Sequence, residues 1–266
     1  MDSKLIVVAP DNVVREARNA EAERKGFDFR DAAEKSLKFF FSPYITAATT
    51  VAEALQSLYK ARESGLNVVQ ISRSEAARFV FPPGHPRDNT LYGAHPAKKG
   101  VYFAVSSFHR LAFEHKFSEA VELLMALGAS EIRVEHICGW SREFAAKLSA
   151  PLPEAAVSAE VSSKESTSSS LLYKANLPGS TSPRLPEEMV WYQHEPTWQS
   201  IAKGRLDYGL KEFSLTVNYD DDFGINAGLK ATASKAEFEL GGSFEDHRAT
   251  SWKLHGKFLS DSNNAA

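Results

Sequence analysis

The sequence predicts an α+β protein, with an N-terminal α/β part followed by a mainly antiparallel β-meander packed on a helix. Three observations predict this class. Apolar and polar side chains alternate over long runs between residues 213 and 258, helix and strand patterns follow one another between residues 5 and 137, and the composition changes at Pro151-Leu152-Pro153.

Four runs make up the alternating region, at residues 213–219, 223–233, 236–244 and 252–258. Successive strand side chains point to opposite faces, so each run would present one apolar and one polar face. Turn-forming residues separate the runs, among them Asp220-Asp221-Asp222 and Glu245-Asp246-His247. Neighbouring runs are therefore expected to pair as antiparallel strands, in a meander of about four strands.

The helix under this sheet is expected just before it in the chain. Pro196 suits a first helical turn, and an apolar stripe follows at nearly helical spacing, formed by Trp198, Ile201, Ala202 and Leu206. One-sided antiparallel sheets normally cover a core in this way. The alternative is that the strands face lipid, because membrane strands show the same alternation.

The first half of the chain mixes helices and strands. Strands are predicted at residues 5–8, 67–71, 101–105 and 130–137, and helices at residues 13–25, 44–63 and 108–127. The last helix has a broad apolar face, with Glu114, Lys116, Glu119 and Glu122 largely opposite it. The strand-helix-strand order over residues 101–137 fits an α/β unit whose two strands could be parallel. Residues 82–100 are the longest irregular stretch of this half.

The best domain boundary lies at Pro151-Leu152-Pro153, which gives an α/β part at residues 1–150 and an antiparallel part with one helix at residues 151–266. One continuous domain is the alternative. Past the boundary, a serine-rich link at residues 164–170 separates two amphipathic runs, at residues 157–161 and 171–175. Such a link is most often a solvated hairpin, and it is also what an insertable hairpin of a pore-forming protein would look like.

Composition narrows the class of protein. The 266 residues carry a formal net charge of −3 and no massed Lys and Arg, which argues against nucleic-acid binding. Cys138 is the only cysteine, so no intrachain disulfide is expected. The apolar run near Met1 is far too short for a signal peptide or a membrane span. We therefore expect a cytoplasmic protein.

The candidate catalytic residues are His85, His95, His109 and Asp88, with His115 nearby in the sequence. Imidazoles can act as general bases or metal ligands, and long loops often carry active sites. The spacing of these histidines matches no metal or hydrolase motif, so a structural or solvated role is the default, and neither a metal nor a cofactor is expected. Nucleotide-binding and hydrolase loop motifs are also missing from the sequence.

The candidate residues for binding a partner or ligand are aromatic: Trp191, Tyr192, Trp198 and Tyr92. The first three could stack on a ligand or lie at an interface, and they would equally suit a hydrophobic core. Cys138 could be a nucleophile, but free cysteines are among the most commonly buried residues, and burial is the expectation.

The leading functional hypothesis is a non-catalytic cytoplasmic protein that binds a protein partner, because the β-rich architecture is clear while every catalytic signal is faint. The first alternative is a hydrolase-type enzyme that uses the His85–His115 region. The second is a cytoplasmic pore-forming effector that inserts amphipathic strands into a membrane, with residues 223–240 among them. Membrane contact is not favoured, and the oligomeric state is left open.

Overall fold

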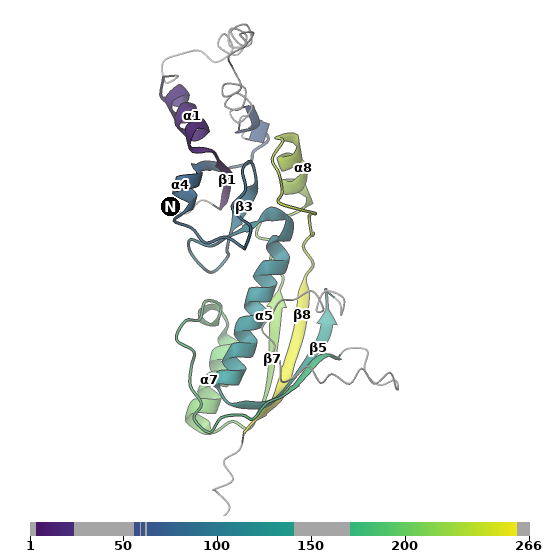
Figure 1. Cartoon of the computed structure of the whole chain (residues 1–266). Helices are drawn as coiled ribbons and strands as arrows, with labels where there is room; N and C mark the ends of the chain where they lie inside the picture. The colour runs from purple at the N-terminus through teal and green to yellow at the C-terminus, as the bar shows by residue number, and fades with distance from the viewer. Residues whose placement is uncertain (1–3, 24–55, 59, 62, 141–170, 260–266) are drawn as a thin grey trace, which may run out of the picture. The chain divides into compact units, whose positions relative to one another are not determined.

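The computed structural model describes residues 4–23, 56–58, 60–61, 63–140 and 171–259. It confirms the α+β class, with two mostly antiparallel sheets and packed helices (Figure 1). The chain divides into two compact units, and each is assembled from two separate stretches. The first unit comprises Met1–His109 and Phe223–Asp246, and the second comprises Arg110–Asp222 and His247–Ala266.

The sheet of the first unit contains four short strands in the order β2-β1-β3-β4. They are β1 (Leu5–Ala9), β2 (Val69–Ser72), β3 (Leu91–Ala94) and β4 (Tyr102–Ala104). Strands β1 and β2 are parallel, and the other pairs are antiparallel. Helix α1 (Asp11–Glu23) follows β1 after a single residue, and the short helix α4 (Arg73–Ala76) follows β2 directly.

Both faces of this sheet are buried. Val7 and Leu91 lie in one apolar cluster together with Leu229 and Ala233 of helix α8 (Ala227–Lys235). Ile6, Val8 and Tyr92, which alternate with those strand residues, lie in a second cluster with Phe79 and Phe81 packed against it. A strand buried on both faces reads as a continuous apolar run, which is why Leu5–Ala9 shows no alternation.

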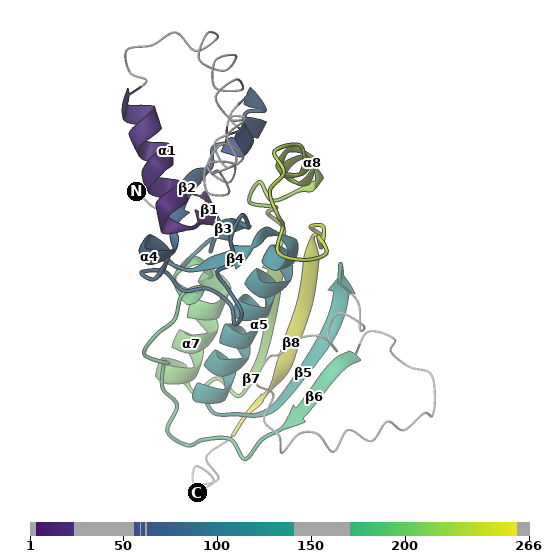
Figure 2. The same ribbon diagram turned by 45° about the horizontal axis from the view of Figure 1, so that its top comes forward.

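The sheet of the second unit is fully antiparallel, in the order β6-β5-β8-β7. Its strands are β5 (Ala129–Cys138), β6 (Leu171–Asn176), β7 (Glu212–Tyr219) and β8 (Thr250–Phe258). Two helices, α5 (Phe108–Ala126) and α7 (Pro196–Tyr208), lie over one face of this sheet (Figure 2).

The helix-covered face of this second sheet holds an aromatic core. Phe113 of α5 contacts Trp252 with ring centroids 4.9 Å apart and Trp140 at 5.3 Å, and both rings meet it edge-on. On β7 the side chains of Phe213, Leu215, Val217 and Tyr219 are buried, whereas Ser214 is exposed. The prediction from the alternation in runs 213–219 and 252–258 is therefore confirmed: both runs are strands with one face on a core and the other face polar.

The prediction for residues 223–233 is wrong, since this run forms a turn and helix α8 rather than a strand. Asn226 caps the helix, because its side-chain oxygen accepts hydrogen bonds from the backbone N–H groups of Gly228 and Leu229 at 3.0 and 3.2 Å. Leu229 and Ala233 are buried one helical turn apart, while Ala231 is exposed. Small residues such as Ala231 are tolerated on either face of a helix, so their alternation with polar residues here does not indicate a strand.

The third run, residues 236–244, forms no regular strand either. Its backbone lies beside residues 89–91, where the N–H of Leu91 donates to the carbonyl of Glu239 and the N–H of Glu239 donates to the carbonyl of Asn89. The meander of about four strands is thus reduced to β7 and β8, which pair directly with each other.

Two expectations for the first half also need correction. The strands at 101–105 and 130–137 are not parallel neighbours, because β4 and β5 belong to different sheets. The stretch at residues 82–100 is not wholly irregular, because it contains β3. Between residues 56 and 63 the described residues are helical, whereas residues 44–55 of the predicted helix lie outside the described part of the chain.

Helix α7 forms where predicted, with Pro196 in its first turn, but its buried face differs by one residue. Leu206 is 39% exposed and Arg205 is buried instead. The Arg205 guanidinium donates to the carbonyls of Leu127, Leu210 and Leu259 at 3.1, 3.2 and 2.8 Å. A buried guanidinium is stable only when its donors are satisfied. Arg205 therefore holds together the backbone just after the ends of α5, α7 and β8.

The domain boundary predicted at residues 151–153 and the serine-rich link at 164–170 lie outside the described residues, so both stay predictions. Strand β5, from the predicted N-terminal part, pairs with β6 and β8 from the predicted C-terminal part. Among the residues that the structure describes, no helix has the length and apolar character needed to cross a bilayer.

Candidate functional site

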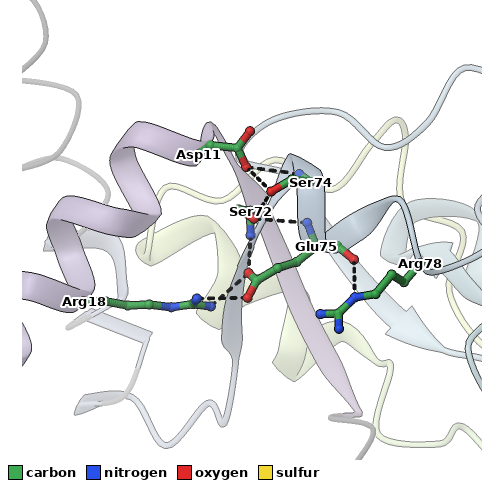
Figure 3. A network of polar contacts seen from close by, with 6 residues as sticks. All are labelled: Asp11, Arg18, Ser72, Ser74, Glu75 and Arg78. Carbon is green, nitrogen blue, oxygen red and sulfur yellow. Dashed lines mark hydrogen bonds and ion pairs between the residues drawn. The ribbon is translucent and has the colours of Figure 1, made fainter.

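A network of polar contacts lies at the carboxyl ends of the parallel strands β1 and β2 (Figure 3). Crevices at the carboxyl ends of parallel strands commonly bind ligands in α/β sheets, so this edge is a natural place to look for a site. The carboxylate of Asp11, at the start of α1, accepts hydrogen bonds from the backbone N–H and the hydroxyl of Ser74, at 3.1 and 2.7 Å. These bonds hold the pKa of Asp11 below its usual value.

Glu75 is the centre of this network. Its two carboxylate oxygens each accept a 2.9 Å hydrogen bond from the Arg18 guanidinium of α1. The backbone N–H of Ser72 donates to the same carboxylate at 2.9 Å, and the Ser72 hydroxyl accepts from the N–H of Glu75 at 3.1 Å, which completes a capping box. The bond from Arg18, followed by the one from Ser72, lowers the pKa of Glu75 to about 2.

The polar groups of this network satisfy one another. Arg18, Asp11 and Glu75 use their charged groups to tie α1, β2 and α4 together, and Arg73 next to them forms a bidentate pair with Asp88 at 2.8 and 3.1 Å. The structure therefore places Asp88, a predicted catalytic residue, in an exposed ion pair. The Ser72-x-x-Glu75 spacing is a signal that sequence reasoning missed, because it is the pattern of a capping box before a short helix.

Of the residues predicted for catalysis or binding in this unit, His85 and Tyr92 come together. The His85 Nδ1 lies 2.7 Å from the Tyr92 hydroxyl, which also accepts the backbone N–H of Arg87 at 2.7 Å. Burial, followed by the nearby Arg87 charge, lowers the pKa of His85, and burial raises the pKa of Tyr92. Both groups are therefore neutral near pH 7, and one hydrogen bond joins the imidazole to the phenol.

The other histidines have separate partners. The His95 Nδ1 accepts the backbone N–H groups of Ala97 and Lys98 at 3.1 and 2.8 Å, so it closes a local turn. His109 is fully buried and hydrogen-bonds to the carbonyl of Ile225. In the second unit, His115 accepts the indole N–H of Trp191 at 3.0 Å. No group of three His, Cys, Asp or Glu side chains within the described ranges is arranged to hold a metal ion.

The aromatic residues predicted for partner binding are mostly inside the protein. Trp191 is 6% exposed, Trp198 and Tyr92 are 0% exposed, and Tyr192 is half-buried. They contribute to the core, and their assignment to a binding surface stays a prediction.

Two buried charged residues of α5 hold the segment that contains Trp191, and sequence reasoning had placed them on the polar face of the helix. The Glu119 carboxylate accepts the backbone N–H groups of Val190, Trp191 and Tyr192 at 2.9, 2.8 and 2.8 Å. The Lys116 ammonium pairs with Glu195 at 2.5 Å, donates to the carbonyl of Asn218 at 2.7 Å and lies 5.1 Å from the centre of the Trp191 ring. Both charges are thus compensated in place.

The expectation that Cys138 is buried is wrong, because the residue is exposed. It is the last residue of β5, and the pairing of β5 with β8 shifts register between His136 and Cys138. Such a shift breaks the strict alternation of faces, so the side chain is not carried into the core.

Strand β7 forms an edge of the second sheet, with β8 on one side. The N–H of Phe258 donates to the carbonyl of Lys211 at 2.8 Å, which identifies 211 and 258 as a hydrogen-bonded pair. In an antiparallel ladder such pairs recur at every second residue, so odd-numbered residues of β7 direct their backbone groups toward β8. The N–H and C=O groups of Glu212, Ser214 and Thr216 therefore point away from the sheet, and no described strand pairs with them.

Strand edges are usually protected by a proline, an inward charge, a bulge or a covering element. Strand β7 contains no proline or glycine, and its pairing with β8 shows no bulge. Its one charged residue is Glu212, the first of the strand, which pairs with Lys257 at 3.5 Å. Just before this strand, at the end of α7, Tyr208 is 78% exposed, the highest value among the large apolar side chains found exposed in the described part. An open edge and an exposed aromatic side chain are typical of a protein interface.

The fold and these surfaces define an α+β protein with an antiparallel sheet edge that no described strand pairs with. Comparison with protein-family models, with curated proteins and with solved structures finds no match to this chain.

Proposed function

We propose that the protein acts without catalysis, by binding a protein partner, and that the outer edge of β7 is its binding surface. One observation supports the proposal: the backbone groups of Glu212, Ser214 and Thr216 point away from the sheet, and no strand in the described part of the chain pairs with them. An extended segment that adds to such an edge gains main-chain hydrogen bonds without any rearrangement of the host sheet.

The two alternative functions stay predictions. The enzyme hypothesis draws on His85, His95, His109 and His115, and these imidazoles have different hydrogen-bond partners. The pore-forming hypothesis counted residues 223–233 as a membrane strand, and residues 227–235 form a helix here. The edge of β7 is the better-supported functional surface.

The test uses Thr216→Pro, which removes one outward N–H. Because that N–H takes no part in the ladder with β8, the fold should persist, as edge strands tolerate proline at such positions. We expect the tagged wild-type chain to retain a partner, identified by mass spectrometry, and the variant to lose at least about tenfold in affinity for it.

The matched control is Thr216→Val, which keeps the N–H and the β-branched shape. In the wild type, binding should slow hydrogen exchange at the amides of Ser214 and Thr216. If Thr216→Pro bound the partner as tightly as Thr216→Val, the binding surface would lie elsewhere.

A further inference from the structure

We infer that the partner at β7 is a second copy of this chain, related by a two-fold axis so that the two β7 strands pair antiparallel across the open edge. The inference rests on the proposed function, because it names the occupant of that same edge. Two observations support it. The side chains of Glu212, Ser214 and Thr216 can pair with a second copy of themselves, and the backbone carbonyl of Asn218 is already occupied by Lys116.

The register follows from which backbone groups are free. Like Ser214, Asn218 directs its backbone groups away from β8, but its carbonyl already accepts a 2.7 Å hydrogen bond from Lys116. A two-fold centred on Leu215 would need that carbonyl. A two-fold centred on Ser214 does not need it, because it pairs Ser214 with its own copy and Glu212 with Thr216, forming about six backbone hydrogen bonds.

The side chains agree with this register. Glu212, Ser214 and Thr216 share the polar face of the sheet, opposite the buried Phe213 and Leu215. In the pairing, the two Ser214 hydroxyls meet each other and each Glu212 carboxylate meets the Thr216 hydroxyl of the other copy. No like charges are opposed, and hydroxyl pairs across strands are favourable. The same patch thus complements itself, as a two-fold interface requires.

The expected strength is modest. Strand β7 has 8 residues, and a pair of strands about 27 Å long buries less surface than stable dimers usually do. The dimer should therefore depend on protein concentration. Backbone hydrogen bonds supply the attraction, and the side chains at position 214 set the register.

The test is a charge exchange at Ser214 in the full chain, followed by sedimentation velocity from about 1 µM to about 1 mM. The wild type should move from monomer to dimer with rising concentration. Ser214→Lys and Ser214→Glu should each remain monomeric, because the two-fold places the introduced like charges opposite each other. An equimolar mixture of the two variants should recover a dimer, as the opposite charges then face across the axis.

The control Ser214→Thr should dimerise like the wild type, and circular dichroism should show the same fold for all four proteins. Dimerisation of either charged variant alone, or a mixture that stays monomeric, would overturn the inference. A wild type that stays monomeric while Thr216→Pro still loses a different bound protein would also overturn it, and would leave the proposed function standing. If the wild type stayed monomeric and Thr216→Pro also lost no bound protein, both the dimer and the proposed function would be contradicted.

Discussion

Glu75 shows how one carboxylate can hold three elements together. It is 27% exposed, and it receives the Arg18 guanidinium of α1 and the N–H of Ser72 while it belongs to α4. Charge-assisted, bidentate contacts of this kind are stronger than ordinary surface ion pairs. Arg18 is 54% exposed, however, so solvent weakens the pair.

We expect Glu75→Gln to lower the free energy of unfolding by about 1 kcal/mol at pH 7. The folded pKa of about 2 lies below the ordinary value of 4.5, so the unfolded chain binds the proton more readily. The contribution is therefore fully present above pH 4.5 and is lost as the pH falls toward 2. The measurement is urea denaturation followed by far-ultraviolet circular dichroism at several pH values from 7 downward.

The matched control for Glu75 is Glu16→Gln, since Glu16 is an exposed residue of α1. This change should leave stability within about 0.5 kcal/mol of the wild type. Tryptophan fluorescence is unsuitable as the probe, because Trp140, Trp191, Trp198 and Trp252 all lie in the second unit. A difference between wild type and Glu75→Gln that did not shrink below pH 4.5 would contradict the role given to the carboxylate.

At the scale of the element, the residues of α8 allow a direct test between a strand and a helix. A strand over residues 223–233 would put Ala231 and Ala233 on one apolar face, whereas the helix buries Ala233 and exposes Ala231. We therefore expect Ala231→Lys to change stability by less than about 0.5 kcal/mol. Ala233→Lys should destabilise by at least about 2 kcal/mol, because it forces an ammonium into an apolar cluster.

This pair of alanine variants serves as its own control, since each introduces the same side chain two residues from the other. Urea denaturation measures both. Hydrogen exchange at α8 should speed up in Ala233→Lys and stay unchanged in Ala231→Lys. Equal destabilisation by the two variants would favour the strand.

The sequence predicted those elements whose pattern has a single interpretation. The apolar face of α5, the alternation in β7 and β8, and Pro196 at the start of α7 are examples. It failed where small residues fit two periods, as in α8, and where the local pattern is too short, as in the four residues of β3. Asn226 and the Ser72-x-x-Glu75 spacing are sequence signals for the starts of α8 and α4 that the prediction did not use.

The candidate sites were harder to predict because they depend on partners far away in the sequence. Trp191 is buried, and its backbone N–H donates to Glu119, which lies 72 residues earlier in the chain. No local pattern shows that a charged residue of α5 will turn inward. The open edge of β7 likewise follows from the strand order, and the strand order emerges only when β5 and β8 are seen to pair.

At the scale of the whole molecule, the strand order has a consequence for fragments. Strand β5 lies between β6 and β8, with Arg133 opposite Lys174 on one side and His255 on the other. A fragment of residues 151–266 lacks β5 and also lacks Phe113 and Phe117 of α5, whose rings contact Trp252 at 4.9 and 5.3 Å. Strand β8 would then lose a neighbour and much of its aromatic core.

We therefore expect residues 151–266, expressed alone, to unfold without a cooperative transition and to lack a near-ultraviolet circular dichroism signal. Co-expression with residues 1–150 should restore both, because that half supplies β5 and α5. The control is the intact chain under the same conditions. If residues 151–266 alone gave a cooperative transition, the strands β6, β7 and β8 would be able to build a core without β5, and the two halves divided at residue 150 would be independent domains.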